Sequence, residues 1–445
     1  GGGEQHRIHT QSGGAADNAA TNTVTVMPGY NGETDGQDGY KTITLNNLNI
    51  DVSGNEGDCA LAVKSGATLN LTLAQNSDNS LKSGVNCSGL NVPDSAGLTI
   101  TGATGTLTAT GGQFGAGIGG DFASGYGSNG NSTSGDVTIK GGTVMAIGGE
   151  NGAGIGGGYA YSGNASTSSG GKVTIKGGTV TAVGGKNSAG IGGGYAVSNQ
   201  QKSTSGEGIV TISGGTVSAK GKDYAAGIGG GKAHAFMDTA TSDGGTVTII
   251  GGSVAATGGS DAKSIGYGVA IQGSSSQGIQ TDAILTDGNN NNVSLVTLTI
   301  NGKNSQPMDT QAIDTLIVGG YTGAEIPDAT AKKYGIHDVT TDTEGKLYLY
   351  LPADATSQAV STGATLNGDN TANTLYAGSV TETDGSRSAA LAPFDGAIDM
   401  SATGGNAYIW DDGFMYGTEA DENAKISYSG NYTLSGGTAE TAIKN

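Results

Sequence analysis

The sequence predicts an all-β protein whose main body is a right-handed, three-faced parallel β-helix, a solenoid in which successive coils stack. A motif of the form VTIKGGTVTAVGG…AGIGGG is written four times between Val137 and Gly268. Short β-branched runs separated by glycine pairs at a fixed period are typical of stacked solenoids. Five glycine-flanked isoleucines mark this period, at intervals of 37, 36, 37 and 37 residues: Ile118, Ile155, Ile191, Ile228 and Ile265.

Each repeat predicts three short strands. In the repeat at Val137, the first strand buries Val137 and Ile139 and leaves Thr138 outside, because side chains alternate along a strand. The second strand buries Val144 and Ala146, and the third is the Ala-Gly-Ile segment. Glycine pairs supply the positive-φ corners between these strands. A polar loop of about 15 residues leaves about 22 residues for the coil, which suits three faces.

The chain divides into four predicted segments. Residues 1–40 are polar and predict an N-terminal arm or cap, and residues 41–305 predict the β-helix, with LVTLTINGK as its last strand. Residues 306–395 predict a small β module, in which VTTDTEGKLYLYLP is a hairpin that turns at Glu344-Gly345. Residues 396–445 alternate again and predict a C-terminal β cap or tail.

The polar loops recur once per coil, so we expect them to emerge along one edge of the solenoid, where functional loops often gather. Their first residues fall at equivalent positions and would stack about 4.8 Å apart, as an aromatic ladder that ends in a cation. These residues are the candidate ligand-binding site: Phe122, Tyr159, Tyr195 and Lys232.

The net charge of −19 and the pI near 4.4 argue against nucleic acid or an anionic membrane as partner, because either would repel this surface. No run of 18 apolar residues exists, so we expect no membrane insertion. The Gly-Gly-Gly start has the look of a mature or trimmed end without a signal peptide. We therefore expect an extracellular protein, secreted or at the cell surface.

Cys59 and Cys87 lie 28 residues apart in segments that should occupy neighbouring coils. Neighbouring strands lie within the Cα distance of a disulfide, although each cysteine has a different offset from the leucine that follows it. The pattern leaves a disulfide and two buried free thiols open. No histidine lies nearby in the sequence, so neither a metal site nor a cofactor is expected.

Catalysis on polysaccharides would need carboxylates that converge on a cleft, and the repeat strands carry almost none. We therefore expect no catalytic residues and no enzymatic activity. Asp411-Asp412 beside Trp410 suggests a sugar site, but the following Gly413 favours a plain turn. Asp287 with its asparagine tract lacks the spaced carboxylates of a calcium loop.

The segments VTIKGGTVTAVGG…AGIGGG, DVTTDTEGKLYLYLP and NYTLSGG resemble the glycine-rich parallel β-helix repeats of secreted bacterial surface proteins, often described as carbohydrate-binding-domain-containing. The resemblance covers most of residues 40–445 and defines no reactive group. It implies an extracellular, adhesin-like structural role. The alternative is a polysaccharide-binding module that uses the loop edge, with glycans as partners.

The two ends of the chain are similar to each other. TQSGGAADNAATN (residues 10–22) and TLSGGTAETAIKN (residues 433–445) are identical at seven of thirteen positions. Either the chain is one unit of a tandem array, or the tail of one molecule adds a strand to the next; both give a head-to-tail rod of copies or neighbouring units. The candidate assembly residues are Thr10, Ser12, Gly13, Gly14, Thr433, Ser435, Gly436 and Gly437.

Overall fold

The computed structural model describes most of the chain between residues 42 and 286 and shorter segments on either side. The described residues are 6–8, 19–28, 42–125, 127–206, 208–286, 293–302, 305–308, 312–318, 335–341, 344–352, 359–362, 375–383, 386–400, 406–417, 420 and 426–436.

All regular structure in these residues is β-strand, which confirms the predicted all-β class. None of the described segments forms an apolar helix of the length needed to cross a bilayer. The chain divides into two compact units. The first, the solenoid unit, holds Gly1–Val247 and Ala256–Ile284, and the second, the C-terminal unit, holds Thr248–Ala255 and Leu285–Asn445.

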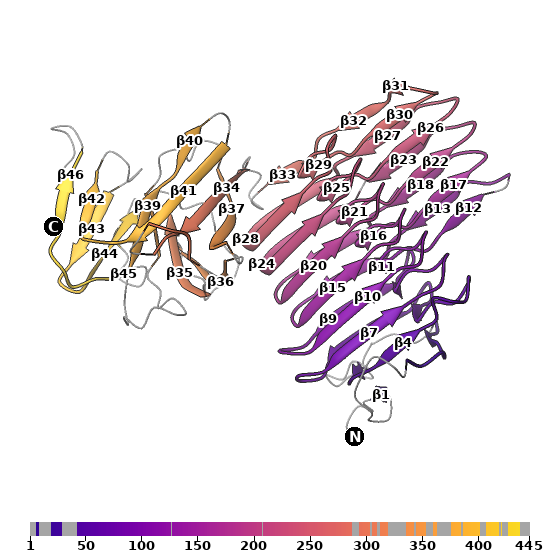
Figure 1. Ribbon diagram of the computed structural model, residues 1–445, viewed down its shortest axis with the longest axis horizontal. Helices are drawn as coiled ribbons and strands as arrows, with labels where there is room; N and C mark the ends of the chain where they lie inside the picture. Colours follow the sequence, from indigo (N-terminus) through magenta and orange to yellow (C-terminus); the bar gives the residue numbers. More distant parts are fainter. Residues whose placement is uncertain are drawn as a thin grey trace. The chain divides into compact units, whose positions relative to one another are not determined.

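Equivalent strands of successive coils pair in parallel in the solenoid unit and form rows, seen in Figure 1 as stacked arrows from indigo to pink. The first row contains β1 (His6–Ile8), β3 (Thr42–Leu45), β6 (Thr68–Leu73), β9 (Gly97–Thr101), β14 (Asp136–Ile139), β19 (Lys172–Ile175) and β24 (Ile209–Lys220). The second row contains β4 (Asn49–Asp51), β7 (Asp78–Lys82), β10 (Thr106–Thr110), β15 (Thr143–Ile147), β20 (Thr179–Val183) and again β24, which spans both rows. The same sheet includes β28 (Thr246–Thr257) and β33 (Ile284–Thr286).

The third row is a sheet of its own. It contains β2 (Val24–Val26), β5 (Leu61–Val63), β8 (Leu90–Asn91), β11 (Ile118–Gly119), β16 (Ile155–Gly156), β21 (Ile191–Gly192), β25 (Ile228–Gly229) and β29 (Ile265–Gly266). Because β1 and β2 pair with β3 and β5, these parts of the predicted N-terminal arm are strands of the solenoid.

The polar segments that we expected to be loops form two further rows of strands. The fourth row contains β12 (Ala123–Gly125), β17 (Ala160–Ser162), β22 (Ala196–Ser198), β26 (Ala233–Ala235) and β30 (Ala270–Gln272), and β31 (Ser276–Gln277) adds to its end as the antiparallel partner of β30. The fifth row contains β13 (Gly130–Thr133), β18 (Ser166–Ser169), β23 (Ser203–Gly206), β27 (Ala240–Asp243) and β32 (Ile279–Thr281). The serine-rich composition indicated exposed loops, but small hydrogen-bonded serine side chains are buried in these rows together with alanine.

Residues of the same kind stack in columns along the solenoid axis. The registers join Leu61 and Leu90 to the five periodic isoleucines of the third row in one continuous column. All members from Leu61 to Ile228 are fully buried. In the first row Val137 and Ile139 are likewise fully buried while Thr138 is partly exposed, as the predicted alternation requires.

A glycine follows each isoleucine of the third row and has a backbone conformation that side chains rarely adopt. Gly156 has φ 136° and Gly192 has φ 136°. A Cβ on Gly192 would lie 2.0 Å from the carbonyl oxygen of Gly229 in the next coil, which is impossible without moving backbone. Glycine at this position therefore permits coils to stack at the distance that main-chain hydrogen bonds require.

Four buried serines of the fifth row bridge consecutive coils, and we call them the serine bridges. Ser205 shows the pattern: its Oγ donates to the carbonyl of Gly194 at 2.6 Å and accepts the N–H of Gly231 at 3.0 Å. Gly194 belongs to the serine's own coil and Gly231 to the next, so one hydroxyl satisfies two buried backbone groups. The four serine bridges are Ser132, Ser168, Ser205 and Ser242.

Apart from the residues of β28, the described strands of the C-terminal unit form three sheets. The largest has the order β36-β35-β38-β39-β41-β34-β37, with β40 paired to β41. Its strands are β34 (Val293–Ile300), β35 (Ala312–Val318), β36 (Gly335–Thr340), β37 (Lys346–Pro352), β38 (Ala359–Thr362), β39 (Tyr376–Ser379), β40 (Thr381–Thr383) and β41 (Ser386–Pro393). The smaller sheets contain β42 (Ala397–Asp399) with β46 (Thr433–Ser435), and β43 (Asn406–Trp410), β44 (Gly413–Gly417) and β45 (Ile426–Ser427).

Two sequence predictions are wrong in this unit. Of the segment LVTLTINGK, expected to end the solenoid, residues 295–300 lie in β34, which pairs with β37 and β41. The expected hairpin at Glu344-Gly345 does not form, because β36 pairs with β35 while β37 pairs with β34. Gly345 does have the positive φ of a turn, at 69°. Alternation indicates a strand in each case but carries no information about which strand is its partner.

We predict that Ser205→Ala lowers the free energy of unfolding by about 2–3 kcal/mol, because it leaves the Gly194 carbonyl and the Gly231 N–H buried without their partner. Urea and thermal unfolding followed by circular dichroism measure the change. Ser218→Ala, on an exposed position of β24, is the matched control and should change stability by less than about 0.5 kcal/mol. Equal effects of the two substitutions would contradict the structural role of the serine bridges.

Candidate functional site

The predicted ligand-binding residues lie at the corner between the third and fourth rows, and main-chain hydrogen bonds place them one above another. The N–H of Tyr159 donates to the carbonyl of Phe114 at 2.8 Å, and the carbonyl of Tyr159 accepts from the N–H of Ala123 in the preceding coil at 2.9 Å. The N–H of Ala160 donates in the same way to the carbonyl of Tyr195 in the next coil at 2.9 Å. The same pattern ties Tyr195 to Asn151 at 3.1 Å. The main-chain hydrogen bonds between coils therefore fix the position of each ladder residue relative to its equivalent in the next coil.

The side chains form the stack that the alignment of the segments predicts, and we call it the aromatic ladder: Phe122, Tyr159 and Tyr195. The ring centroids of Phe122 and Tyr159 are 5.4 Å apart with an interplanar angle of 18°, and those of Tyr159 and Tyr195 are 5.4 Å apart at 22°. All three rings are partly exposed. Burial raises the pKa of Tyr195 to about 12, so this phenol is neutral at physiological pH.

Lys232 ends the ladder, as predicted, and contacts two rings. Its Nζ lies 5.5 Å from the ring centroid of Tyr195 and 4.4 Å from that of Tyr224. Both distances fall within the range of a cation–π interaction. Burial lowers the pKa of Lys232, with a smaller contribution from the charge of Lys186.

Phe114 and Tyr224 belong to this cluster but were missed by sequence reasoning. Phe114 contacts both Phe122 and Tyr159, with centroids 5.2 Å and 5.3 Å away. Each of the two stands four residues before a periodic isoleucine, where intervening coils have Asn151 and Asn187. Aligning the repeats at this offset would have revealed them.

The packing of the ladder limits what it can bind. A sugar ring stacks on an aromatic face, but the faces of Tyr159 are turned toward Phe122 and Tyr195. Ring edges are what such a stack presents to a ligand. The geometry therefore supports a role in holding the corner of the solenoid, and the ligand-binding role stays a prediction.

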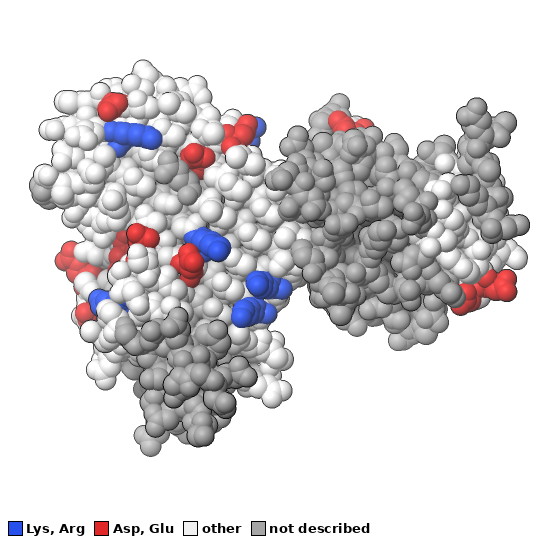
Figure 2. Space-filling view, turned by 180° about the vertical axis from the view of Figure 1, so that it is seen from behind, with Lys and Arg blue, Asp and Glu red and all other residues white. Residues whose placement is uncertain are grey.

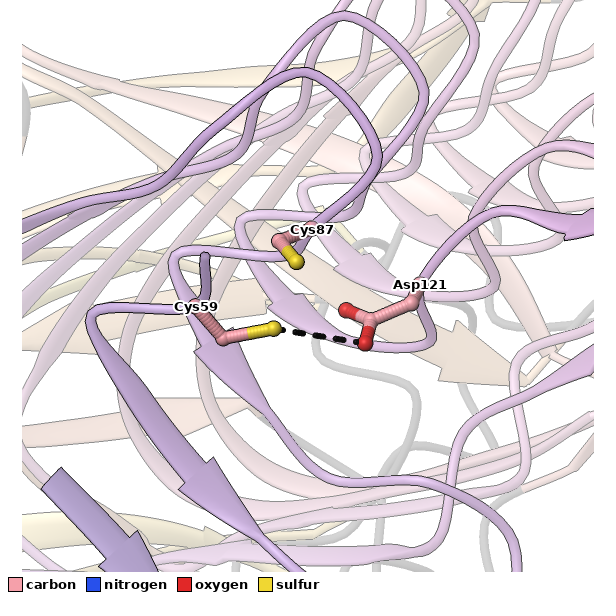
Figure 3. A group of neighbouring side chains, drawn as sticks. All are labelled: Cys59, Cys87 and Asp121. Atoms are coloured by element: carbon pink, nitrogen blue, oxygen red, sulfur yellow. Dashed lines mark hydrogen bonds between the residues drawn. The ribbon is translucent and has the colours of Figure 1, made fainter. Parts of the chain in front are cut away.

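Cys59 and Cys87, predicted as either a disulfide or two free thiols, are free thiols in the structure. They face each other and the carboxyl group of Asp121, as Figure 3 shows. The Cys59 thiol donates to Asp121 Oδ2, with sulfur and oxygen 3.5 Å apart. The three donor atoms lie within 4.8 Å of one another, which makes this cluster the place where the described residues could hold a metal ion. The disulfide itself stays a prediction.

Hydrogen bonds from Ser88 and burial have opposite effects on the pKa of Asp121. The backbone N–H of Ser88 donates to Asp121 Oδ1 at 2.7 Å and its hydroxyl donates to the same atom at 2.6 Å. Burial raises the pKa of Asp121, against the effect of these bonds, which favour the carboxylate. The neighbouring Cys87 thiol and burial raise the pKa of the Cys59 thiol.

Asp121 escaped the sequence analysis although the repeats contain a signal for it. It stands where the later coils have a glycine, so the motif GIGGG becomes GIGGD in the first of them. Asp121 therefore adds a carboxylate at a corner where the later coils have no side chain. This carboxylate points toward the cysteines of the two preceding coils.

The remaining predicted sites lie in the C-terminal unit or outside the described residues. Asp411 and Asp412 form the exposed two-residue turn of the hairpin β43–β44, and Trp410 packs against Met415. The turn position is as expected, and a sugar site there stays a prediction. Residues 287–292, the asparagine tract, are not described. Among the assembly candidates, Thr10, Ser12, Gly13, Gly14 and Gly437 also lie outside the described residues. Thr433 and Ser435 belong to β46, and Gly436 follows it.

We predict that Tyr159→Ala lowers the free energy of unfolding by about 2–3 kcal/mol, because the ring loses stacking contacts with Phe122, Tyr195 and Phe114. Tyr161→Ala is the control, since its ring contacts Tyr159 alone among the described rings, at 6.4 Å; its effect should stay below about 1 kcal/mol. Thermal and urea unfolding give both values. A Tyr159 variant as stable as the parent would show that the ladder does not support the corner.

Comparison with known families supports the repeat architecture. Residues 98–126, 137–159, 173–195 and 210–232 match a family model described as beta helix repeat. Neither the curated proteins nor the solved structures gave a match to this chain. The last three matched segments run from the first row to a residue of the ladder corner, Tyr159, Tyr195 or Lys232, so they stop before the fourth and fifth rows. The matched repeats and the stacked rows together show that the solenoid unit is a parallel β-helix.

Proposed function

We propose that this protein is a non-catalytic, extracellular structural protein of a cell surface, with an adhesive role. The observation that carries the proposal is the continuity of the stack. Identical or similar residues lie opposite one another in register from β5 to β29. The interior of the solenoid is filled by aliphatic side chains, glycine and hydrogen-bonded serine. Such a body is rigid and presents the same surface again in every coil.

The distribution of charge supports a structural role over a catalytic one. Figure 2 shows one face of the molecule, on which the charged side chains of the described residues are scattered as small spots among uncharged residues. General acid–base catalysis on a glycan requires two carboxyl groups that flank the scissile bond. The charged residues in this view do not gather in that manner, and we propose that the protein has no hydrolase or lyase activity.

Polysaccharide binding is the second candidate, and the aromatic residues at the solenoid edge favour it. Besides the aromatic ladder, the turn after β26 places Phe236 beside His234, with ring centroids 4.2 Å apart. Phe236 is 49% exposed and the following Met237 is 80% exposed. Partly exposed rings are common where proteins contact sugars, because C–H groups pack on aromatic surfaces.

A glycan array with the purified chain separates the two candidates. We expect no binding above background, and no release of reducing ends from plant or bacterial polysaccharides, if the role is structural. Binding that is lost in Phe236→Ala and retained in Tyr161→Ala, with unchanged melting temperature in both, would instead establish the polysaccharide-binding candidate.

Head-to-tail assembly is part of the structural proposal, and the pairing and exposure of the tail strand β46 support it. β46 pairs in parallel with β42 of the same chain, with Leu434 opposite Ile398. All three β46 residues are exposed. Donation of this segment to another molecule would therefore exchange the β42–β46 pairing for an equivalent pairing between molecules.

We predict that the intact protein forms oligomers that grow with concentration and that Leu434→Asp prevents this growth, because a charge at β46 disfavours strand pairing. Sedimentation velocity and electron microscopy measure the size. Ile409→Asp is the control, since Ile409 is 39% exposed and Leu434 36%. A strictly monomeric parent, or assembly that Leu434→Asp leaves unchanged, would show that the tail does not mediate polymerisation.

A further inference from the structure

Three side chains with metal-binding atoms meet at one corner of the solenoid, and each comes from a different coil. Cys59 precedes β5, Cys87 precedes β8 and Asp121 follows β11. These strands are consecutive members of the third row. Their sulfur and carboxylate oxygen atoms lie within 4.8 Å of one another, and the side chains point inward to a common centre (Figure 3).

We propose that Cys59, Cys87 and Asp121 form a binding site for a thiophilic divalent metal ion, with Zn²⁺ as the representative. Two sulfur ligands and one carboxylate oxygen, completed by water, make a four-coordinate zinc site with one exchangeable position. Cys59 is partly exposed, which gives the ion and the water a route to the site.

The distance between donors fits this ion. Tetrahedral zinc has Zn–S bonds of about 2.3 Å and Zn–O bonds of about 2.0 Å, which place a sulfur and an oxygen ligand about 3.5 Å apart. The sulfur of Cys59 lies 3.5 Å from Asp121 Oδ2. The cluster therefore needs little rearrangement to take up the ion.

The surroundings orient the carboxylate ligand. Ser88 donates two hydrogen bonds to Asp121 Oδ1, from its backbone N–H at 2.7 Å and its hydroxyl at 2.6 Å. These bonds hold one oxygen and leave Oδ2 directed at the sulfur of Cys59. Outer partners of this kind fix metal ligands in place and contribute to affinity.

Charge and ligand chemistry both favour a transition ion over calcium or magnesium. The ion pairs among the described residues join Lys82 to Asp51 and Lys346 to Glu344, and neither includes Asp121. A divalent cation would supply the missing positive charge. Calcium and magnesium prefer oxygen donors alone, whereas a pair of thiolates selects softer ions.

Binding would lock three consecutive coils together at the N-terminal part of the solenoid. The ion takes the place of the two thiol protons, which pass to water, and so replaces the Cys59–Asp121 hydrogen bond by bonds to all three segments. An ion that binds the folded state alone raises stability by mass action. Oxidation to a disulfide would consume the same two sulfurs, so the pair serves one purpose or the other.

Cobalt(II) is the probe for the test, because tetrahedral thiolate coordination gives it intense visible bands and a sulfur-to-metal charge-transfer band in the near ultraviolet. The full chain is reduced, freed of reductant and metal under anaerobic conditions, and titrated with CoCl₂ and then ZnCl₂. We expect one equivalent of cobalt to bind with both bands, zinc to displace it, and zinc to raise the melting temperature.

Four variants complete the test. Cys59→Ser and Cys87→Ser, which each keep one thiolate, should weaken cobalt binding and lower the charge-transfer absorbance per bound cobalt to about half or less, and Asp121→Asn, which keeps the shape of the side chain, should weaken zinc binding at least about tenfold in competition with a chelating dye. Asp136→Asn, at an exposed carboxylate on β14, should bind as the parent does. Each variant is first shown to be folded by circular dichroism. A parent spectrum without the charge-transfer band, or zinc affinity unchanged in Asp121→Asn, would overturn the proposal.

Discussion

Main-chain hydrogen bonding between successive coils is the constraint on which the rest of this structure depends. Parallel pairing places each residue opposite its equivalent in the next coil. The two residues are separated by the distance between neighbouring strands, about 4.8 Å. Whatever the sequence puts at one position is therefore repeated as a column. The aliphatic core, the positive-φ glycines, the serine bridges and the aromatic ladder are four such columns, each with a different chemical solution to the same spacing.

The columns differ in how many residue types they accept. The glycine column accepts glycine alone, because a Cβ on Gly156 or Gly192 would overlap a carbonyl oxygen of the next coil. The ladder column is less strict, since it holds Phe122, Tyr159 and Tyr195 and then accepts Lys232 over the last ring. A column can change its residue type wherever the replacement still covers the neighbour, and this is where new chemistry can enter a solenoid.

The sequence predicted well whatever repeats in register. The period of the isoleucines located the third row, and alternation around Val137 located the buried face of the first. The sequence predicted poorly the features that occur in one coil only and the pairing of each strand with its neighbours in a sheet. Asp121 occurs once, so no period marks it, and its contact with Cys59 spans 62 residues. The strand β34 alternates like a solenoid strand, yet its partners are β37 and β41.

The serine bridges also bear on how such a chain can change in length. Each hydroxyl takes its acceptor from its own coil and its donor from the following one, and Gln280 continues the series by donating to the carbonyl of Gly268 at 3.0 Å. A segment added inside a paired strand would shift the residues that follow it out of their columns. The turns are more tolerant, because the coil from Ile155 to Ile191 is one residue shorter than its neighbours and keeps its register. Duplication of a whole coil preserves every buried contact, so this molecule can lengthen during evolution by whole coils while the length of its turns varies.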